Sequence, residues 1–170
     1  MIRALVLTGA PGAGKSAVLE ALHGLLDNDG VPHAFLESEL LAAGHPWLNE
    51  REAYAVLAVT LRELRVRGRD RFLIAATTET GEHLRWLLDA IAADETVVVC
   101  VTASPKTAAR RVREREPAEW HGRDRLVAAA RRLAVKIPAL DGIDLRVSTE
   151  DRAARDVARE LRGRVAWLQP

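Results

Sequence analysis

The sequence predicts a single α/β domain in which helices cover both faces of a five-stranded parallel sheet. Segments with apolar residues at helical spacing alternate along the whole chain with short apolar runs of strand length. These runs lack the polar alternation of a sheet that faces water on one side, and residues 96–101 are the clearest case. Strictly alternating strands and helices are typical of crossover units, which join parallel strands. A length of 170 residues fits one domain, 1–170.

The first half of the chain alternates three predicted strands with helices. The strands are the apolar runs 2–7, 31–36 and 72–76. The helix after the first run ends at the polar segment 27–30, and its apolar face comprises Ala17, Val18, Ala21, Leu22, Leu25 and Leu26. Asn49, followed by Glu52, has the spacing of a capping box and predicts the start of a long helix. The apolar stripe of that helix is Ala53, Val56, Leu57, Leu61 and Leu64.

The second half repeats the alternation. A helix marked by Leu84, Leu87, Leu88 and Ile91 precedes the strand at 96–101. Ser104 followed by Pro105 predicts the next helix start, with serine as the cap. A further helix follows the break at 117–122, with Leu126, Val127, Ala130, Leu133, Ala134 and Ile137 on one face. Residues 143–147 predict the last strand. Thr149 is expected to cap a final helix at about 150–164, and residues 167–170 are expected to fray.

Composition excludes several classes of partner. The net charge of +1 gives the whole molecule no footprint for nucleic acid or an anionic membrane. No apolar run approaches the length of a membrane span, and the N-terminus lacks the features of a signal peptide. The single cysteine, Cys100, excludes an internal disulfide and is expected to be buried. We therefore expect a cytoplasmic protein that has neither a nucleic-acid nor a membrane partner.

The most specific motif directly follows the first strand. Residues 9–16, Gly-Ala-Pro-Gly-Ala-Gly-Lys-Ser, match the Walker A pattern GxxxxGK[ST]. A strand, a glycine-rich turn and a helix N-terminus together form a phosphate cradle made of backbone N–H groups. Lys15 is expected to contact the β- and γ-phosphates, and the Ser16 hydroxyl is expected to bind Mg²⁺. The predicted nucleotide-binding residues of this segment are Gly9, Ala10, Pro11, Gly12, Ala13, Gly14, Lys15, Ser16 and Ala17.

With this motif at the start of an α/β chain, the sequence resembles the P-loop nucleoside and nucleotide kinase superfamily. It is similar in particular to small-molecule kinases such as chloramphenicol phosphotransferase and the shikimate, gluconate and adenylylsulfate kinases. It also looks like bacterial proteins labelled AAA family ATPase, a label that rests on the loop alone. The resemblance implies a three-layer P-loop NTPase fold with sheet order 2-3-1-4-5 and a short lid. It extends over nearly the whole chain as architecture, although only the Walker A motif is highly specific.

Two glutamates follow the second strand. The resembling kinases carry an Asp-x-Asp here, and Glu37-Ser38-Glu39 takes its place with one extra methylene in each acid. A carboxylate near the γ-phosphate can accept a hydroxyl proton or orient the waters of Mg²⁺. The resemblance implies Glu39 as the catalytic base and Glu37 as a ligand of metal-bound water. Two solvated acids after a strand remain the alternative.

The third strand departs from other P-loop proteins. A Walker B strand would end in an aspartate, whereas Thr77 and Thr78 follow here and the first acid is Glu79. This departure counts against a self-sufficient hydrolytic ATPase more than against a kinase that uses the acids of the second strand. Glu79 can contribute to the metal through a water.

Arginines are concentrated after the fourth strand. Residues 110–132 carry eight arginines and four acids. The resemblance implies that Arg111 stacks on adenine, that Arg115 reaches the phosphates, and that residues 116–123 form the lid. Arg123 and Arg132 are weaker candidates for contacting the phosphates. An exposed helix with local arginine–glutamate pairs is the alternative.

Together these features predict a phosphotransferase that moves the γ-phosphoryl group of ATP, or another NTP, to a small-molecule acceptor with Mg²⁺ as cofactor. Lys15, Glu39 and Arg115 are the expected catalytic residues, and Ser16 and Glu37 the metal site. The alternatives are an NTPase without a phosphoryl acceptor and a nucleotide-binding regulator. The sequence leaves open the acceptor, the choice between ATP and GTP, and the oligomeric state.

Overall fold

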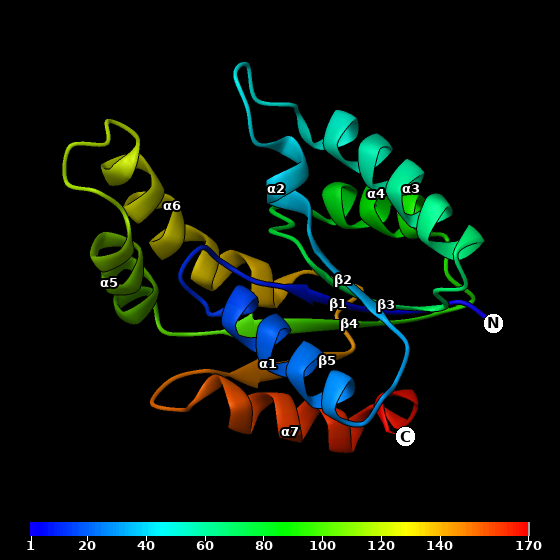
Figure 1. Ribbon diagram of the computed structural model, residues 1–170. Coiled ribbons are helices and arrows are strands. Elements are labelled where there is room, and N and C mark those ends of the chain that lie inside the picture. Colours follow the sequence, from blue (N-terminus) through cyan, green and yellow to red (C-terminus); the bar gives the residue numbers. More distant parts are fainter. Residues whose placement is uncertain (170) are drawn as a thin grey trace.

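Five parallel strands form one sheet with the order β2-β3-β1-β4-β5 in the computed structural model, which describes residues 1–169 (Figure 1). The strands are β1 (Arg3–Thr8), β2 (Ala34–Glu37), β3 (Arg71–Ala75), β4 (Glu95–Thr102) and β5 (Leu145–Ser148). The helices of the first half are α1 (Lys15–Asn28), α2 (Ser38–Ala42), α3 (Glu50–Val66) and α4 (Gly81–Ile91). Those of the second half are α5 (Pro105–Arg115), α6 (Arg123–Lys136), η1 (Ile137–Ala139), α7 (Ala154–Arg164) and η2 (Ala166–Leu168). The predicted α/β class and sheet order are confirmed.

The central strand β1 shows why the strands are apolar along their whole length. It pairs with β3 on one side and β4 on the other, and residues 4–8 are buried. Successive side chains point to opposite faces of the sheet. Ala4 and Val6 accordingly join the core under α3 and α4, whereas Leu5 and Leu7 join the core under α1 and α7. Helices cover both faces, so residues 4–7 of β1 are apolar on both faces, and its polar residues Arg3 and Thr8 stand at the two ends of the strand.

The helices α5 and α6 form a separate unit at one end of the sheet. Ala108, Ala109 and Val112 of α5 pack against Val127 and Ala130 of α6 in a small cluster of their own. Figure 1 shows this pair extending past the ends of the strands on the side where β1 leads into α1. The arginines of α5 and α6 are thus carried to the carboxyl edge of the sheet, where ligands of parallel α/β folds bind.

Two of the three helix starts predicted from capping residues, those at Asn49 and Ser104, are confirmed. The Asn49 side chain accepts the backbone N–H of Glu52 at 3.1 Å, and the Glu52 carboxylate accepts that of Asn49 at 2.9 Å. Ser104 accepts the N–H of Thr107 at 3.1 Å at the start of α5. No helix within residues 1–169 is both long enough and apolar enough to cross a membrane.

Several predictions about local structure were wrong, among them the place of Ala17 on a buried helix face, since this residue is exposed. Thr149 does not cap the last helix, because α7 begins at Ala154 without a side-chain cap and the Thr149 hydroxyl bonds elsewhere. The described part of the C-terminal tail is not frayed, because Trp167 and Leu168 are buried in the core with α1 and α7. Pro170 lies outside the described residues. On α3, Val56 is exposed and Tyr54 is buried in its place.

Candidate active site

The glycine-rich loop between β1 and α1 is held against α5, and its three glycines have backbone conformations that disfavour other residues. Gly12 has φ +78°, and a Cβ atom there would lie 2.2 Å from the carbonyl oxygen of Ala108. Gly14 has φ +98° and directly precedes α1. The first turn of a helix has backbone N–H groups without intrahelical partners, which favour an anion. The loop therefore has the construction that a phosphate site requires.

Lys15 lies where charged residues of three other elements meet. Its Nζ donates to the carbonyl oxygens of Gly9 at 3.0 Å and Ala10 at 3.4 Å. Burial lowers the pKa of Lys15, whereas the nearby carboxylates of Glu39 and then Glu37 raise it, and the charge of Arg115 lowers it further. The ammonium group is thus within electrostatic reach of both glutamates and of Arg115, although these residues lie far apart in the sequence.

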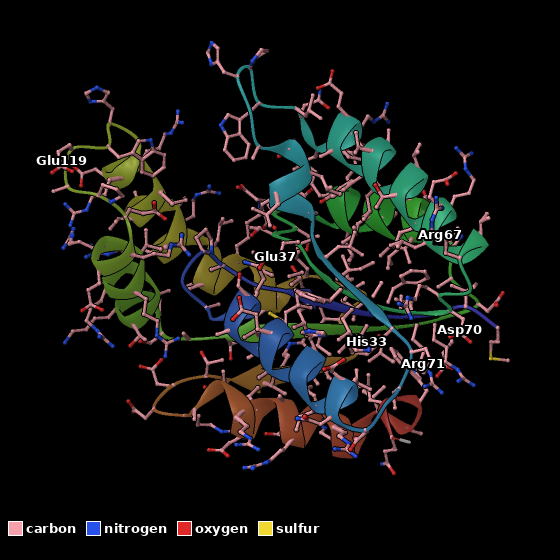
Figure 2. All side chains as sticks on the ribbon, in the orientation of Figure 1. His33, Glu37, Arg67, Asp70, Arg71 and Glu119 are labelled. Atoms are coloured by element: carbon pink, nitrogen blue, oxygen red, sulfur yellow. The ribbon has the colours of Figure 1, made fainter. Side chains whose placement is uncertain are left out.

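Ser16 and Glu37 meet at the first turn of α1. The Ser16 hydroxyl donates to the Glu37 carboxylate at 2.8 Å, and Figure 2 shows Glu37 beside this turn at the end of β2. A hydroxyl and a carboxylate oxygen are ligands suited to Mg²⁺, which keeps several waters and takes its remaining ligands from phosphates. The two residues expected at the metal are therefore adjacent and chemically suitable for it.

Glu39 is fixed by the loop after β3. It lies in α2, a helix that the sequence analysis did not predict, and its carboxylate accepts the Thr77 backbone N–H at 2.8 Å. The Ser38 hydroxyl donates to its other oxygen at 3.4 Å. Glu37 and Glu39 consequently have different partners, since one faces α1 and the other faces the β3–α4 loop.

Threonines occupy the place of the missing Walker B aspartate. The hydroxyls of Thr8 and Thr78 are 2.6 Å apart in a fully buried hydrogen bond that joins β1 to the loop after β3. Glu79, the first acid beyond, contacts Arg132 of α6 at 3.4 Å. Arg132 therefore faces an acid at the edge of the sheet, and this ion pair connects α6 with the β3–α4 loop.

Arg111 is part of a junction rather than an exposed ion pair. Its guanidinium donates to the Thr149 hydroxyl and to the Thr149 carbonyl oxygen, each at 2.9 Å, and to the Gly12 carbonyl oxygen at 3.3 Å. The Thr149 hydroxyl in turn donates to the carbonyl oxygen of Ala13 at 2.7 Å. The alternative of a locally paired arginine is thus wrong for Arg111, which joins α5 and the β5–α7 loop to the phosphate loop.

The other arginines are less closely engaged with the phosphate loop. Arg115 pairs with Glu116 at 2.6 Å, although its charge reaches Lys15. Arg123 donates to the Arg113 carbonyl oxygen at 2.8 Å and so faces α5. The turn between α5 and α6 covers residues 116–122, whereas Arg123, the last residue of the predicted lid, begins α6. Figure 2 shows Glu119 at the far end of this turn, away from the sheet, and its role as a lid stays a prediction.

A cavity of about 190 Å³ adjoins Glu39. Its walls include Glu39, Trp47, Glu50, Tyr54, Thr77 and Glu79. Tyr54 was not among the predicted site residues, although its position three residues before Leu57 and seven before Leu61 continues the buried stripe of α3. Burial raises the pKa of Tyr54, and the nearby carboxylates of Glu39 and Glu50 raise it further.

Comparison with solved structures finds small-molecule kinases of the same fold. A shikimate kinase from Acinetobacter baumannii in complex with shikimate is 19% identical with a TM-score of 0.63, and the match covers 99% of this chain and 96% of that chain. The APS kinase of Mycobacterium tuberculosis in complex with AMPPNP and APS is 18% identical with a TM-score of 0.66, covering 94% and 95%. A gluconokinase from Sinorhizobium meliloti is 16% identical with a TM-score of 0.60, covering 98% and 93%. Neither a family model nor a curated protein sequence matches the chain. The chain has the P-loop α/β fold of these small-molecule kinases.

Proposed function

We propose that this chain is a phosphotransferase that transfers the γ-phosphoryl group of ATP to a hydroxyl of a small molecule. One observation carries the proposal: a phosphate loop, an adjacent hydroxyl–carboxylate pair and a second, separately held carboxylate surround Lys15 next to a cavity. A hydrolase that only positions water does not require such a cavity. The likeness to kinases, one of them in complex with AMPPNP and APS, supports the same conclusion.

The residues at the phosphate end bind and neutralise charge. Lys15 and the backbone N–H groups of residues 9–17 other than Pro11 would hold the phosphates, and Ser16 and Glu37 would hold Mg²⁺ directly or through its waters. Bound Mg²⁺ would neutralise phosphate charge at this position. Arg115 adds positive charge once it exchanges Glu116 for a phosphate oxygen, and Arg111, which contacts the phosphate loop from α5, borders the adenine.

Glu39 acts at the acceptor end. The acceptor oxygen forms a bond to the γ-phosphorus while the bond between the γ-phosphorus and the bridging β-phosphate oxygen breaks. The Glu39 carboxylate takes the proton that the acceptor hydroxyl loses. The Thr77 N–H holds one oxygen of Glu39 in place, so the carboxylate is oriented before the acceptor enters. A larger hollow of about 400 Å³ lies beside Arg51, Trp86 and Asp89, but Glu39 lines only the smaller cavity, so the acceptor belongs in the smaller one.

Measurement of ADP release tests the proposal. The full chain is titrated with ATP and Mg²⁺ and then supplied with sugars, nucleosides, nucleotides and amino alcohols. We expect an acceptor that raises ADP release above the basal rate. Lys15→Ala is expected to abolish nucleotide binding or turnover, whereas Lys136→Ala, at the exposed end of α6, is the matched control. If no acceptor raises turnover, the chain is a nucleotide-binding regulator or an NTPase.

A further inference from the structure

The cavity beside Glu39 is acidic. Three carboxylates line it, those of Glu39, Glu50 and Glu79, and its described walls contain no lysine, arginine or histidine. The positive charges of the site, Lys15 and Arg115, belong to the phosphate side. The two halves of the site therefore carry opposite charge. The positive half suits the phosphates, and the negative half repels an anion.

Glu50 gives the cavity charge that other residues do not neutralise. It is the first residue of α3, and no basic side chain of residues 1–169 lies within ion-pair distance of it. The neighbouring Arg51 stacks its guanidinium over Trp86, 4.5 Å from the ring centroid, and thus faces the other hollow. Glu79 pairs with Arg132, but both side chains are partly exposed, so solvent weakens that pair.

Tyr54 supplies a second and independent sign of a ligand. The residue is 4% exposed and lines both this cavity and the larger hollow, and its hydroxyl forms no hydrogen bond with a described residue. A hydroxyl with open bonding positions at a cavity wall can bond a ligand. The carboxylates of Glu39 and Glu50 both raise its pKa, which places the ring near the two acids. The indole of Trp47 at the wall adds an aromatic face of the kind that attracts cations.

We propose that the acceptor is a small amino alcohol, whose hydroxyl lies at Glu39 and whose ammonium group lies between Glu50 and Glu79 within reach of the Tyr54 hydroxyl. This inference rests on the proposed phosphotransferase function. The cavity of about 190 Å³ corresponds to the liquid volume of about six water molecules, which accommodates a compact amino polyol. An anionic acceptor would face three carboxylates, and a neutral one would leave Glu50 without a counter-charge.

Two series of candidate acceptors, each matched in shape and different in charge, test the charge preference. The test measures binding and does not require turnover. One series is 2-aminopropane-1,3-diol, glycerol and glycerate, and the other is glucosamine, glucose and glucuronate. Each compound is titrated into the full chain by calorimetry with Mg²⁺ and a non-hydrolysable ATP analogue. We expect the amine to bind roughly tenfold more tightly than the neutral alcohol, and the acid to bind least. Added salt is expected to reduce this preference.

Two variants locate the effect. Glu50→Gln is expected to narrow the preference of the amine over the alcohol by about three- to tenfold. Glu63→Gln on the exposed side of the same helix is the control and is expected to leave the preference unchanged. Thermal unfolding of both variants verifies that α3 is intact.

The outcomes separate the two proposals. Equal or tighter binding of the neutral or acidic members, or no binding of the amines at millimolar concentration, would overturn the charge preference. Phosphorylation of neutral alcohols as efficiently as amines would overturn it too, and would leave the phosphotransferase proposal standing. Selective amine binding without phosphorylation of any member would instead overturn the phosphotransferase proposal and support an amine-binding site.

Discussion

Replacing Thr149 by valine would remove one hydroxyl from the junction of α5, the phosphate loop and the β5–α7 loop, with almost no change of shape. The residue is 4% exposed, and its hydroxyl donates to the Ala13 carbonyl oxygen at 2.7 Å while it accepts from Arg111 at 2.9 Å. Its methyl group, 3.3 Å from the position of a Gly14 Cβ, is kept in valine. The substitution therefore leaves a buried carbonyl oxygen and one guanidinium N–H without their partners.

The size of the effect follows from those lost bonds. Leaving a buried polar group unpaired costs about 1–3 kcal/mol. Arg111 keeps its bond to the Thr149 carbonyl oxygen, so the expected loss in the free energy of unfolding is about 2 kcal/mol. For a chain of this length such a loss lowers Tm by about 4–8 °C.

Urea unfolding of wild type and variant, with calorimetric Tm as a second reading, measures this loss. Thr60→Val is the control, because the Thr60 hydroxyl donates only to the Val56 carbonyl oxygen on the exposed side of α3. ATP affinity is expected to fall in Thr149→Val alone, since Ala13 belongs to the phosphate loop. A Thr149→Val protein whose free energy of unfolding is within about 0.5 kcal/mol of wild type, the usual range for surface substitutions, would show that the Thr149 hydroxyl does not stabilise this junction.

Three further predictions concern the loop, the metal and the buried thiol. Gly12→Ala puts a Cβ atom 2.2 Å from the Ala108 carbonyl oxygen at φ +78°, and we expect nucleotide affinity, measured by calorimetry, to fall at least tenfold. Unchanged affinity would contradict the close approach. Glu37→Gln is expected to raise the Mg²⁺ concentration that gives half-maximal turnover, with little effect on metal-free nucleotide binding, whereas an unchanged Mg²⁺ dependence would remove Glu37 from the metal site. Burial raises the pKa of Cys100 from 9.0 to about 11, so the folded chain keeps a proton that the unfolded chain loses, and stability falls as the pH rises from 9 to 11. Urea titrations over this range are expected to show a fall in the free energy of unfolding that is larger by about 2 kcal/mol than in Cys100→Ala, and equal falls in the two proteins would refute the raised pKa of Cys100.

The features that depend on local sequence were predictable. The apolar strand runs, the capping signals of Asn49 and Ser104 and the glycine-rich loop are local patterns, and the structure has strands, helix starts and a tight loop at these places. The pairing of Ser16 with Glu37 follows from the fold, because the first turn of α1 and the end of β2 meet at the same edge of the sheet.

The remaining features depend on contacts between distant residues. Thr149 looked like a helix cap because threonine is a common cap, but its partner is Ala13, 136 residues away. The bonds of Arg111 to the phosphate loop outweigh the local pairing that its sequence neighbours suggested. Tyr54 had the correct helical spacing, but only the packing of α3 against the sheet shows that it is buried and that it lines the cavity.

The central claim is that phosphate passes from ATP to a hydroxyl held beside Glu39. Phosphorus NMR of a reaction containing the full chain, ATP, Mg²⁺ and the amino alcohols tests it directly. The account predicts the resonance of a phosphate monoester with wild type, formed about 10²–10⁴ times more slowly by Glu39→Gln although ATP binding is intact. Inorganic phosphate as the sole product, or an equally fast Glu39→Gln variant, would contradict it.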